Sequence, residues 1–299
     1  MTIALLADRV RPEEKLLLEA YAARLIPVER IDPRRLSLRA DDLSSTPELE
    51  QVTVVHDRSI AFGTSMHLTE LLETRGLVCV NSSAVVRTCG DKLRTSAALA
   101  RRGVPQPETR VAFSPEEALR LLDEELGYPA VLKPVVGSWG RLVARLNDRH
   151  AAEAVLEDRA TLGNWTHGTL YLQRLVHKPE RDLRVFLIGD EPVAGIARVS
   201  EHWVTNTARG ARVENLDLES ELGRRCAELA LEAGRAVGGG LLAVDLVEDP
   251  LRGPLVLEVN HGFEFRNSSV PTGVDLAGCI ADHVGRVREA HTHWTEVPA

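Results

Sequence analysis

Three side chains that carry oxygen atoms fall on two apolar stretches late in the chain. In residues 255–260, Glu258 and Asn260 share one face of an expected strand, because side chains alternate along a strand. Asp245 lies inside a second apolar stretch, 243–247, where a buried carboxylate needs a partner. Oxygen ligands in this arrangement suit Mg²⁺ that is shared with the phosphates of a substrate. Asp245, Glu258 and Asn260 are therefore candidate metal ligands. The alternative is that they are ordinary polar residues facing solvent.

A glycine-rich loop between two expected strands is a candidate cover for phosphate groups. Lys133 ends the first strand, and the loop Pro134–Gly140 that follows contains Gly137 and Gly140. Glycines let backbone N–H groups approach an anion closely, and a lysine adds a positive charge. The order of residues is not that of a Walker A loop, since the lysine precedes the glycines. Strand, loop and strand in this order predict a hairpin flap, with an ordinary glycine turn as the alternative.

Other charged residues are weaker candidates. Lys92 opens an expected helix, 91–102, where a cation is unfavourable unless an anion binds beside it. A surface lysine is the alternative, although two lysines facing one polyphosphate would favour a binding role. Asp182 and Arg184 share a strand face and could simply pair with each other. A basic patch in or near the long loop 201–212 contains Arg198, Asn206, Arg209 and Arg212. Loops of this length are often functional.

The elements that must position these residues alternate between strands and helices, which is typical of the α/β class. Expected strands cover residues 3–7, 52–56, 77–81, 130–133, 141–145, 170–175, 183–188, 192–199, 241–247 and 255–260. Expected helices cover residues 11–23, 91–102, 114–126 and 218–237. We divide the chain into an N-terminal domain of residues 1–86, a central part of residues 87–175, a C-terminal part of residues 176–290 and a tail of residues 291–299.

The composition favours a globular enzyme. The chain has 299 residues and a net charge of -8, which gives no reason to expect nucleic acid as a partner. No apolar run reaches membrane-spanning length, so we expect no membrane association. The four cysteines lack metal or redox spacing, and we expect a cytoplasmic protein. The run 238–243 satisfies G-x-G-x-x-A but follows a helix and opens a strand, the reverse of a dinucleotide-binding motif.

Several stretches taken together resemble the ATP-grasp ligases. These stretches are Asp91–Lys92, Leu126–Pro134, Gly137–Gly140, Asp182-x-Arg184 and Glu258-x-Asn260. The sequence is more similar still to one branch, the LysX-type ligases of amino-group carrier proteins, which are related to RimK-type ligases. The segments that carry this closer resemblance are Asp8–Pro12, Gly137–Arg141, His202–Gly210 and Glu264–Ser268. The resemblance extends over nearly the whole chain.

The resemblance implies an α/β ATP-grasp fold, in which a small open α/β domain precedes two subdomains that hold ATP between them. It implies an ATP-dependent carboxylate–amine ligase with ATP and Mg²⁺ as cofactors. Such enzymes convert the C-terminal glutamate side chain of a small acidic, LysW-like carrier protein into an acyl phosphate. The α-amine of glutamate or 2-aminoadipate then attacks it. The implied role is in lysine, arginine or related amino-acid biosynthesis, and a homo-oligomer is compatible with it.

The resemblance also implies roles for individual residues. The implied nucleotide-binding residues are Lys92, Lys133, Gly137, Ser138, Trp139, Gly140, Gln173, Arg174, Leu175, Val176, Asp182 and Arg184. The implied metal ligands are Asp245, Glu258 and Asn260. Residues implied around the acyl phosphate and acceptor are Arg184, Arg198, Asn206 and Arg209, with His202, Gly262, Phe263 and Asn267 as further substrate contacts.

Two positions distinguish this chain within the resemblance. Relatives commonly have glutamate after the residue that corresponds to Gln173, whereas this chain has Arg174, so we expect backbone contacts to adenine in place of that side chain. The pair Gly262-Phe263 resembles that of glutamate-using relatives. A physical reason is that glutamate is one methylene shorter than 2-aminoadipate, and a phenyl ring could shorten the pocket to suit it. The alternative is that Phe263 packs in the core. Two rival functions remain open, a RimK-type ligase that adds glutamate to another protein or to a small-molecule carboxylate, and a non-catalytic nucleotide-binding regulator.

Overall fold

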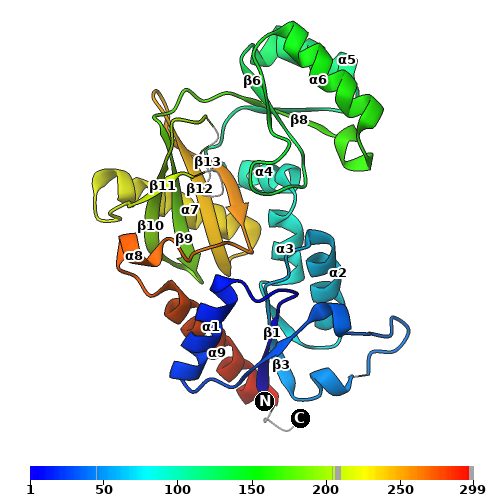
Figure 1. Cartoon of the computed structure of the whole chain (residues 1–299), viewed down its shortest axis with the longest axis vertical. Helices are drawn as coiled ribbons and strands as arrows, with labels where there is room; N and C mark the ends of the chain where they lie inside the picture. The colour runs from blue at the N-terminus through cyan, green and yellow to red at the C-terminus, as the bar shows by residue number, and fades with distance from the viewer. Residues whose placement is uncertain (45, 204, 206–209, 296–299) are drawn as a thin grey trace.

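The computed structural model describes the chain apart from residues 45, 204, 206–209 and 296–299, and apart from the side chains of residues 165 and 292–295. The described part forms three sheets, and each sheet is the centre of one lobe (Figure 1). The N-terminal lobe lies at the bottom of Figure 1 together with both ends of the chain, and the central lobe lies at the top. The five-stranded sheet lies between them. This mixture of sheets and covering helices confirms the α/β class.

The N-terminal lobe is built on a parallel sheet in the order β2-β1-β3-β4. Its elements are β1 (Thr2–Leu6), α1 (Pro12–Ala23), β2 (Val28–Ile31), β3 (Val52–Asp57), α2 (Phe62–Glu73), β4 (Val78–Val80) and α3 (Ser83–Cys89). Strand β1 pairs with β2 on one side and with β3 on the other. The order of the strands therefore reverses between β1 and β3. In open parallel sheets, ligands bind at the carboxyl ends of the strands at such a switch point.

The last helix returns to this first lobe. Helix α9 (Leu276–Thr295) lies beside α1 in Figure 1, where its red ribbon meets the blue one. Leu17 of α1 shares a hydrophobic core with Leu276 and Ile280 of α9. The first and last helices thus belong to one lobe. Residues 291–295 of the expected tail continue α9.

The central lobe is built on an antiparallel sheet in the order β5-β8-β6-β7. Its elements are β5 (Thr109–Ala112), α5 (Pro115–Leu121), β6 (Ala130–Lys133), β7 (Ala144–Leu146), α6 (Arg149–Leu162) and β8 (Leu170–Arg174), and helix α4 (Lys92–Arg101) precedes them. Side chains of α5 and α6 form one core with β5 to β8. Ser114 accepts a hydrogen bond from the backbone N–H of Glu117 and is the N-cap of α5, which begins within the helix expected at 114–126.

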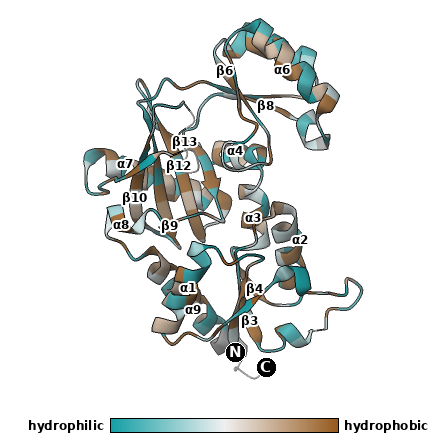
Figure 2. Cartoon of the chain, in the orientation of Figure 1, coloured by the Kyte–Doolittle hydropathy of each residue, from teal (hydrophilic) through white to brown (hydrophobic). Residues whose placement is uncertain are grey.

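The five-stranded sheet is antiparallel and has the order β11-β10-β9-β12-β13. Its elements are β9 (Arg181–Ile188), β10 (Glu191–Val199), β11 (Arg212–Asn215), α7 (Glu221–Val237), β12 (Leu241–Asp249) and β13 (Gly253–Asn260), followed by α8 (Ser269–Thr272). Helix α7 covers one face, where Cys226 and Ala230 share a core with Leu183 and Val244. The strands of this sheet are largely coloured as hydrophobic in Figure 2.

The other face of this sheet is apolar at one end of its strands and charged at the other. Phe186 and Ile188 of β9 belong to the core shared with the N-terminal lobe. Arg184 lies on the same face because side chains two residues apart share a face. It pairs with Asp245 of β12, which in turn pairs with Glu258 of β13. The sheet therefore carries a row of charged side chains beyond the apolar end of this face.

Each strand and helix expected from the sequence has a counterpart in the structure. The strand expected at 141–145 is shorter and later, at Ala144–Leu146, because the flap before it turns back as far as Leu142. Helices α2, α3, α6, α8 and α9 and strands β2, β5 and β11 were not predicted. Across the residues that the structure describes, no helix is both long and apolar enough to cross a lipid bilayer.

Candidate active site

A cavity of about 490 Å³ lies among the three lobes. Its wall combines the flap after β6, the segment after β8, the charged end of the five-stranded sheet and the carboxyl edge of the N-terminal sheet. Nine basic and four acidic side chains of the described residues line it. The cavity is therefore cationic, although the whole chain has a net charge of -8.

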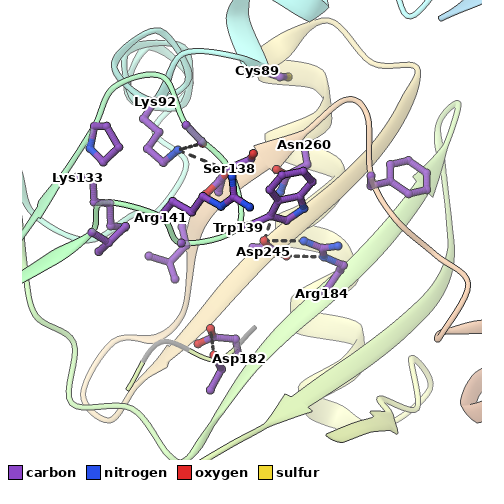
Figure 3. Close-up of a pocket in the computed structure, with 18 of the residues that line it drawn as sticks. Cys89, Lys92, Lys133, Ser138, Trp139, Arg141, Asp182, Arg184, Asp245 and Asn260 are labelled. Atoms are coloured by element: carbon purple, nitrogen blue, oxygen red, sulfur yellow. Dashed lines mark hydrogen bonds and ion pairs between the residues drawn. The ribbon is translucent and has the colours of Figure 1, made fainter. Parts of the chain in front are cut away.

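Asp245 is the centre of a charged group in this cavity (Figure 3). Arg184 donates to both of its carboxylate oxygens, at 2.6 Å from Nε to Oδ1 and 2.9 Å from Nη2 to Oδ2. Arg198 Nη2 lies 3.1 Å from Oδ1, and Asn260 Nδ2 donates to Oδ2 at 3.3 Å. Burial raises the pKa of Asp245, but the two arginines outweigh burial and hold the pKa at about 2. Asp245 is therefore an anion at neutral pH.

Glu258 and Asn260 share one face of β13, as predicted from alternation, and the pairing of β13 with β12 sets them beside Asp245. The side chain of Glu258 is 29% exposed, and its Oε1 lies 3.8 Å from Lys92 Nζ. No three His, Cys, Asp or Glu side chains of the described residues gather into a metal-binding group. A Mg²⁺ ion shared with phosphates needs only one or two protein carboxylates, so Glu258, Asn260 and Asp245 fit this ion. Glu258 is the more accessible carboxylate, since arginines already bind Asp245.

The two lysines expected to face one polyphosphate both line the cavity. Lys92 is the first residue of α4, and its Nζ donates to the carbonyl oxygen of Gly137 at 2.8 Å. Lys133 ends β6 and donates to Gln173 Oε1 at 2.6 Å. Burial lowers the pKa of Lys133 to about 8, and the positive charge of Lys92 adds to this effect. A bound anion would favour the charged form of Lys133.

The flap over the cavity has an unusual backbone. Trp139 has φ of 58°, Gly140 has 62° and Leu142 has 58°, all in the left-handed region. The guanidinium carbon of Arg141 lies 4.9 Å from the centre of the Trp139 ring, a cation–π contact. Gly137, Ser138, Trp139 and Gly140 all line the cavity. The structure thus contains the expected loop between two strands, and its role in binding phosphate stays a prediction.

The segment at the end of β8 forms another part of the wall. Gln173 is buried, accepts a hydrogen bond from Lys133 and donates to Thr109 Oγ1 at 3.1 Å. The side chain of Arg174 pairs with Glu108 at 2.9 Å. Leu175 and Val176 line the cavity together with Gln173 and Arg174. Arg174 is therefore held by Glu108 at the end of the sheet.

Asp182 is buried beside the long loop that follows β10. Lys178 Nζ and the Thr205 hydroxyl both hydrogen-bond to its carboxylate, and Lys178 Nζ lies 3.0 Å from Thr205 Oγ1. The suggested pairing of Asp182 with Arg184 is wrong, because Arg184 bonds to Asp245 on the neighbouring strand. Lys178 was not predicted as a site residue, although it lies four residues before Asp182.

Gly262 and Phe263 line the cavity, but the phenyl ring of Phe263 belongs to the core. Its centre lies 5.4 Å from the ring of Phe186 and 6.3 Å from that of Phe265. This position matches the alternative that the sequence left open. A Cβ atom added to Gly262 would meet no atom within 4 Å, so that position borders open space.

Four further expected site residues are not among the described residues that line the cavity. His202 and Asn267 are exposed and do not line the cavity. His202 stacks on Trp203, which does line it. Asn206 and Arg209 lie outside the described residues. The substrate-binding roles of these four residues stay predictions.

The N-terminal lobe contributes cavity residues that were not predicted from the sequence. Arg11 follows β1 and Arg58 follows β3, and both line the cavity. A signal was present in the sequence, since polar residues directly after the strands of a parallel sheet are candidates for ligand binding.

Comparisons with known proteins identify the family. The sequence model of the RimK-like ATP-grasp domain matches residues 89–284, and that of the LysX preATP-grasp domain matches residues 3–88. The chain therefore belongs to the RimK-like ATP-grasp family, and this membership confirms the resemblance seen in the sequence. Its members are ligases, and the chain is an ATP-dependent carboxylate–amine ligase with an α/β ATP-grasp fold.

Particular relatives narrow the comparison. The chain is 39% identical over 225 residues to the "Alpha-aminoadipate--LysW ligase LysX" of Sulfurisphaera tokodaii, covering 75% of this chain and 77% of the relative. It is 30% identical over 286 residues to the "Glutamate--LysW ligase ArgX" of the same organism, covering 95% and 98%. A crystal structure of a RimK domain protein ATP-grasp from Sphaerobacter thermophilus superposes with a TM-score of 0.78 at 31% identity, covering 95% and 99%.

Proposed function

We propose that the chain joins the α-amine of an amino dicarboxylic acid, glutamate or 2-aminoadipate, to the C-terminal glutamate side chain of a small acidic LysW-like carrier protein. The observation that carries the proposal is the similarity, over 95% of this chain, to a protein named a glutamate–LysW ligase. The reaction consumes ATP, releases ADP and phosphate, and serves lysine, arginine or related amino-acid biosynthesis in the cytoplasm.

Amide formation from a carboxylate at neutral pH requires a better leaving group than water, and ATP supplies one by forming an acyl phosphate. The protein then has to position the reactants and neutralise charge, which suits lysine and arginine side chains. Lys92 and Lys133 bind the phosphates beneath the flap Gly137–Gly140. The segment Gln173–Val176 borders the base. These assignments are supported by the presence of all these residues in one cavity wall.

Arg184 and Arg198 stabilise the negative charge that develops when the acyl phosphate forms and reacts. Arg198 is 8% exposed, and its Nε has no hydrogen-bond partner among the described residues, so it has a donor available for a ligand oxygen. Glu258, Asn260 and Asp245 hold Mg²⁺, which supplies positive charge against the phosphates. Asn206 and Arg209, which lie in the sequence between β10 and β11, complete the acceptor side.

The cationic cavity fits an acidic carrier. Nine basic side chains around one cavity attract an acidic tail, whereas the net charge of -8 on the whole chain disfavours unspecific binding of acidic proteins. Glutamate is the proposed preferred acceptor and 2-aminoadipate the weaker one. Since the ring of Phe263 packs in the core, the length of the acceptor pocket depends on Gly262 and its backbone rather than on that ring.

The test is to incubate the purified enzyme with ATP, Mg²⁺, a LysW-like carrier and either glutamate or 2-aminoadipate, and to measure the intact mass of the carrier. We expect the carrier to gain one amino acid. A carrier that lacks its C-terminal glutamate is the matched control and should stay unmodified. An unchanged carrier with every candidate amino acid would refute the proposal.

A RimK-type ligase that adds glutamate to another protein is the second candidate. The match of residues 89–284 to the RimK-like ATP-grasp domain supports this candidate, because that domain is shared by ligases with different protein acceptors. The match of residues 3–88 to the LysX preATP-grasp domain favours the carrier ligase. Modification of a different acidic protein tail, with no modification of the carrier, would decide for the RimK-type activity.

A further inference from the structure

We propose that Arg58, on the N-terminal lobe, binds a carboxylate of the amino-acid acceptor. This inference rests on the proposed function, because it assigns the acceptor of that reaction to one wall of the cavity. No resemblance or comparison assigned a role to Arg58. Its position, its hydrogen bonds and the charge around it each support the assignment.

The position of Arg58 is that of a ligand-binding residue in an open parallel sheet. It directly follows Asp57, the last residue of β3, and β3 pairs with β1 in the middle of the sheet. The strand order reverses between these two strands, and their carboxyl ends form the crevice in which such sheets bind ligands. Arg11 follows β1 at the same edge, and both arginines line the cavity.

The hydrogen bonds of Arg58 leave one donor group unused. The residue is 5% exposed. Its Nε donates to Glu14 Oε1 at 3.1 Å and its Nη1 donates to the carbonyl oxygen of Phe263 at 3.0 Å. Its Nη2 is buried and has no hydrogen-bond partner among the described residues. Buried polar groups are rarely left unpaired, so a ligand that accepts from Nη2 would satisfy this site.

The neighbours of Arg58 hold it rigidly without neutralising it fully. Glu14 is fully buried and shares its carboxylate with Arg11, which donates to it from Nε at 2.9 Å and from Nη2 at 2.8 Å. One carboxylate thus serves two guanidinium groups. Glu13 and Arg266 lie at the edge of this group, 4.0 Å apart between Oε1 and Nε, and their charges offset each other. The Arg11–Glu14–Arg58 group therefore keeps a positive charge at the cavity wall.

The chemistry of the acceptor matches this wall. Glutamate and 2-aminoadipate carry two carboxylates and one amine, and arginine is the side chain best suited to binding a carboxylate. The cations assigned to the nucleotide, Lys92 and Lys133, come from other lobes. Arg58 is bonded to the backbone of Phe263, and the next residue, Glu264, also lines the cavity and offers an anion for an ammonium group.

The test uses the complete enzyme, a LysW-like carrier and ATP, with hydroxylamine as a small acceptor that lacks a carboxylate. Hydroxylamine attacks the acyl phosphate and gives a hydroxamate with release of phosphate, so it reports activation of the carrier alone. The wild-type enzyme is then assayed with glutamate, with its side-chain amide and with its α-amide. We expect one of the two amides to have a KM raised by about tenfold to a hundredfold, since it loses a charged hydrogen bond. The sensitive amide identifies which carboxylate the enzyme recognises, and the variant arm tests whether Arg58 is the residue that binds it.

The variant arm uses Arg58→Gln, with Arg235→Gln as matched control. Arg235 is half-exposed on α7, pairs with Glu232 and does not line the cavity. We expect Arg58→Gln to raise the KM for glutamate by about tenfold to a hundredfold, to leave the KM of the sensitive amide nearly unchanged and to retain hydroxamate formation. Arg235→Gln should behave as wild type.

Two failures are distinguishable. If the wild-type enzyme forms no hydroxamate with the carrier, the proposed function fails and this inference fails with it. If hydroxamate forms but the wild-type KM is the same, within about threefold, for glutamate and both amides, the proposed function stands and the assignment of Arg58 is overturned. This second result needs no variant, so it holds even if Arg58→Gln does not fold.

Discussion

The guanidinium group of Arg184 and the carboxylate of Asp245 form a two-point ion pair across neighbouring strands, with N–O distances of 2.6 and 2.9 Å. Arg198 of β10, on the other side of β9, binds the same carboxylate at 3.1 Å. One buried anion therefore compensates two cations. If the proposed phosphate and metal ion bind here, the arginines would gain a second anion and Asp245 a cation, so no buried charge would be left unpaired.

This ion pair predicts different effects for two candidate metal ligands. Asp245→Asn removes the shared anion and leaves two buried guanidinium groups unpaired, so we expect a loss of about 3–5 kcal/mol in the free energy of unfolding. Glu258→Gln affects a side chain that is 29% exposed, so we expect a loss of less than about 1 kcal/mol. Denaturant unfolding without nucleotide measures both, and the same variants should each need more Mg²⁺ for ADP release.

The two readouts separate a metal ligand from a purely structural carboxylate. Equal stability of the two variants would contradict the role of Asp245 in holding the arginines. An unchanged Mg²⁺ requirement for Glu258→Gln would show that this residue is not a metal ligand.

The two lysines of the cavity should act on the first chemical step. Lys133→Met and Lys92→Met each remove one positioned charge, so we expect hydroxamate formation from the carrier to fall about a hundredfold or more. Lys15→Met, on the exposed side of α1, is the matched control and should keep wild-type activity. Wild-type turnover in both cavity variants would mean that the flap does not cover the phosphates.

Lys133 also predicts a pH dependence of nucleotide binding. Burial lowers its pKa to about 8, so the lysine is charged below that pH and loses its proton above it. Bound phosphates favour the charged form, and the affinity for ATP should therefore fall by up to about tenfold for each pH unit above 8. Calorimetric titration from pH 7 to 9 measures this decrease. Lys133→Arg, which stays charged, should bind ATP with a much flatter pH profile, and an equally steep profile would assign the titration to another group.

The choice of acceptor should respond to Gly262 more than to Phe263. Gly262→Thr adds a side chain where no atom lies within 4 Å of the new Cβ, so it narrows the cavity without strain. We expect kcat/KM for 2-aminoadipate to fall about tenfold relative to glutamate, because one methylene is worth about 1–3 kcal/mol in such a pocket. Phe263→Leu is the control, since its ring packs in the core and its loss should lower stability while keeping the acceptor ratio. If Phe263→Leu changed the acceptor ratio and Gly262→Thr did not, the Phe263 ring would contact the acceptor.

For residues on regular strands, the sequence correctly predicted which side chains share a face. Alternation along β13 put Glu258 and Asn260 on one face, and the register of the sheet sets Asp245 opposite Glu258. Which partner each charge chooses depends on the neighbouring strand. Asp182 and Arg184 share a face of β9, yet one bonds to Lys178 and the other to Asp245. Strand order is a tertiary property that periodicity does not contain.

Long-range contacts explain the rest of what the sequence did not predict. Helix α9 packs beside α1, some 250 residues earlier in the chain, so neither its face nor its lobe follows from its own composition. Arg58 lies after a strand in a run with no motif, and its role appears only when Phe263 and Glu14 are seen around it. The ring of Phe263 likewise turns to the core because Phe186 and Phe265 surround it.

The most direct test of the central claim is ADP release coupled to modification of the carrier. The wild-type enzyme is mixed with ATP, Mg²⁺, glutamate and a LysW-like carrier, and ADP is measured together with the mass of the carrier. We predict one ADP for each carrier modified. ADP should not be released when the C-terminal glutamate of the carrier is removed, and it should not exceed about one ADP per enzyme when no amine acceptor is present. ADP release that does not depend on the carrier tail, or a carrier that stays unmodified while ADP accumulates, would contradict the claim that this chain is a carrier-protein ligase.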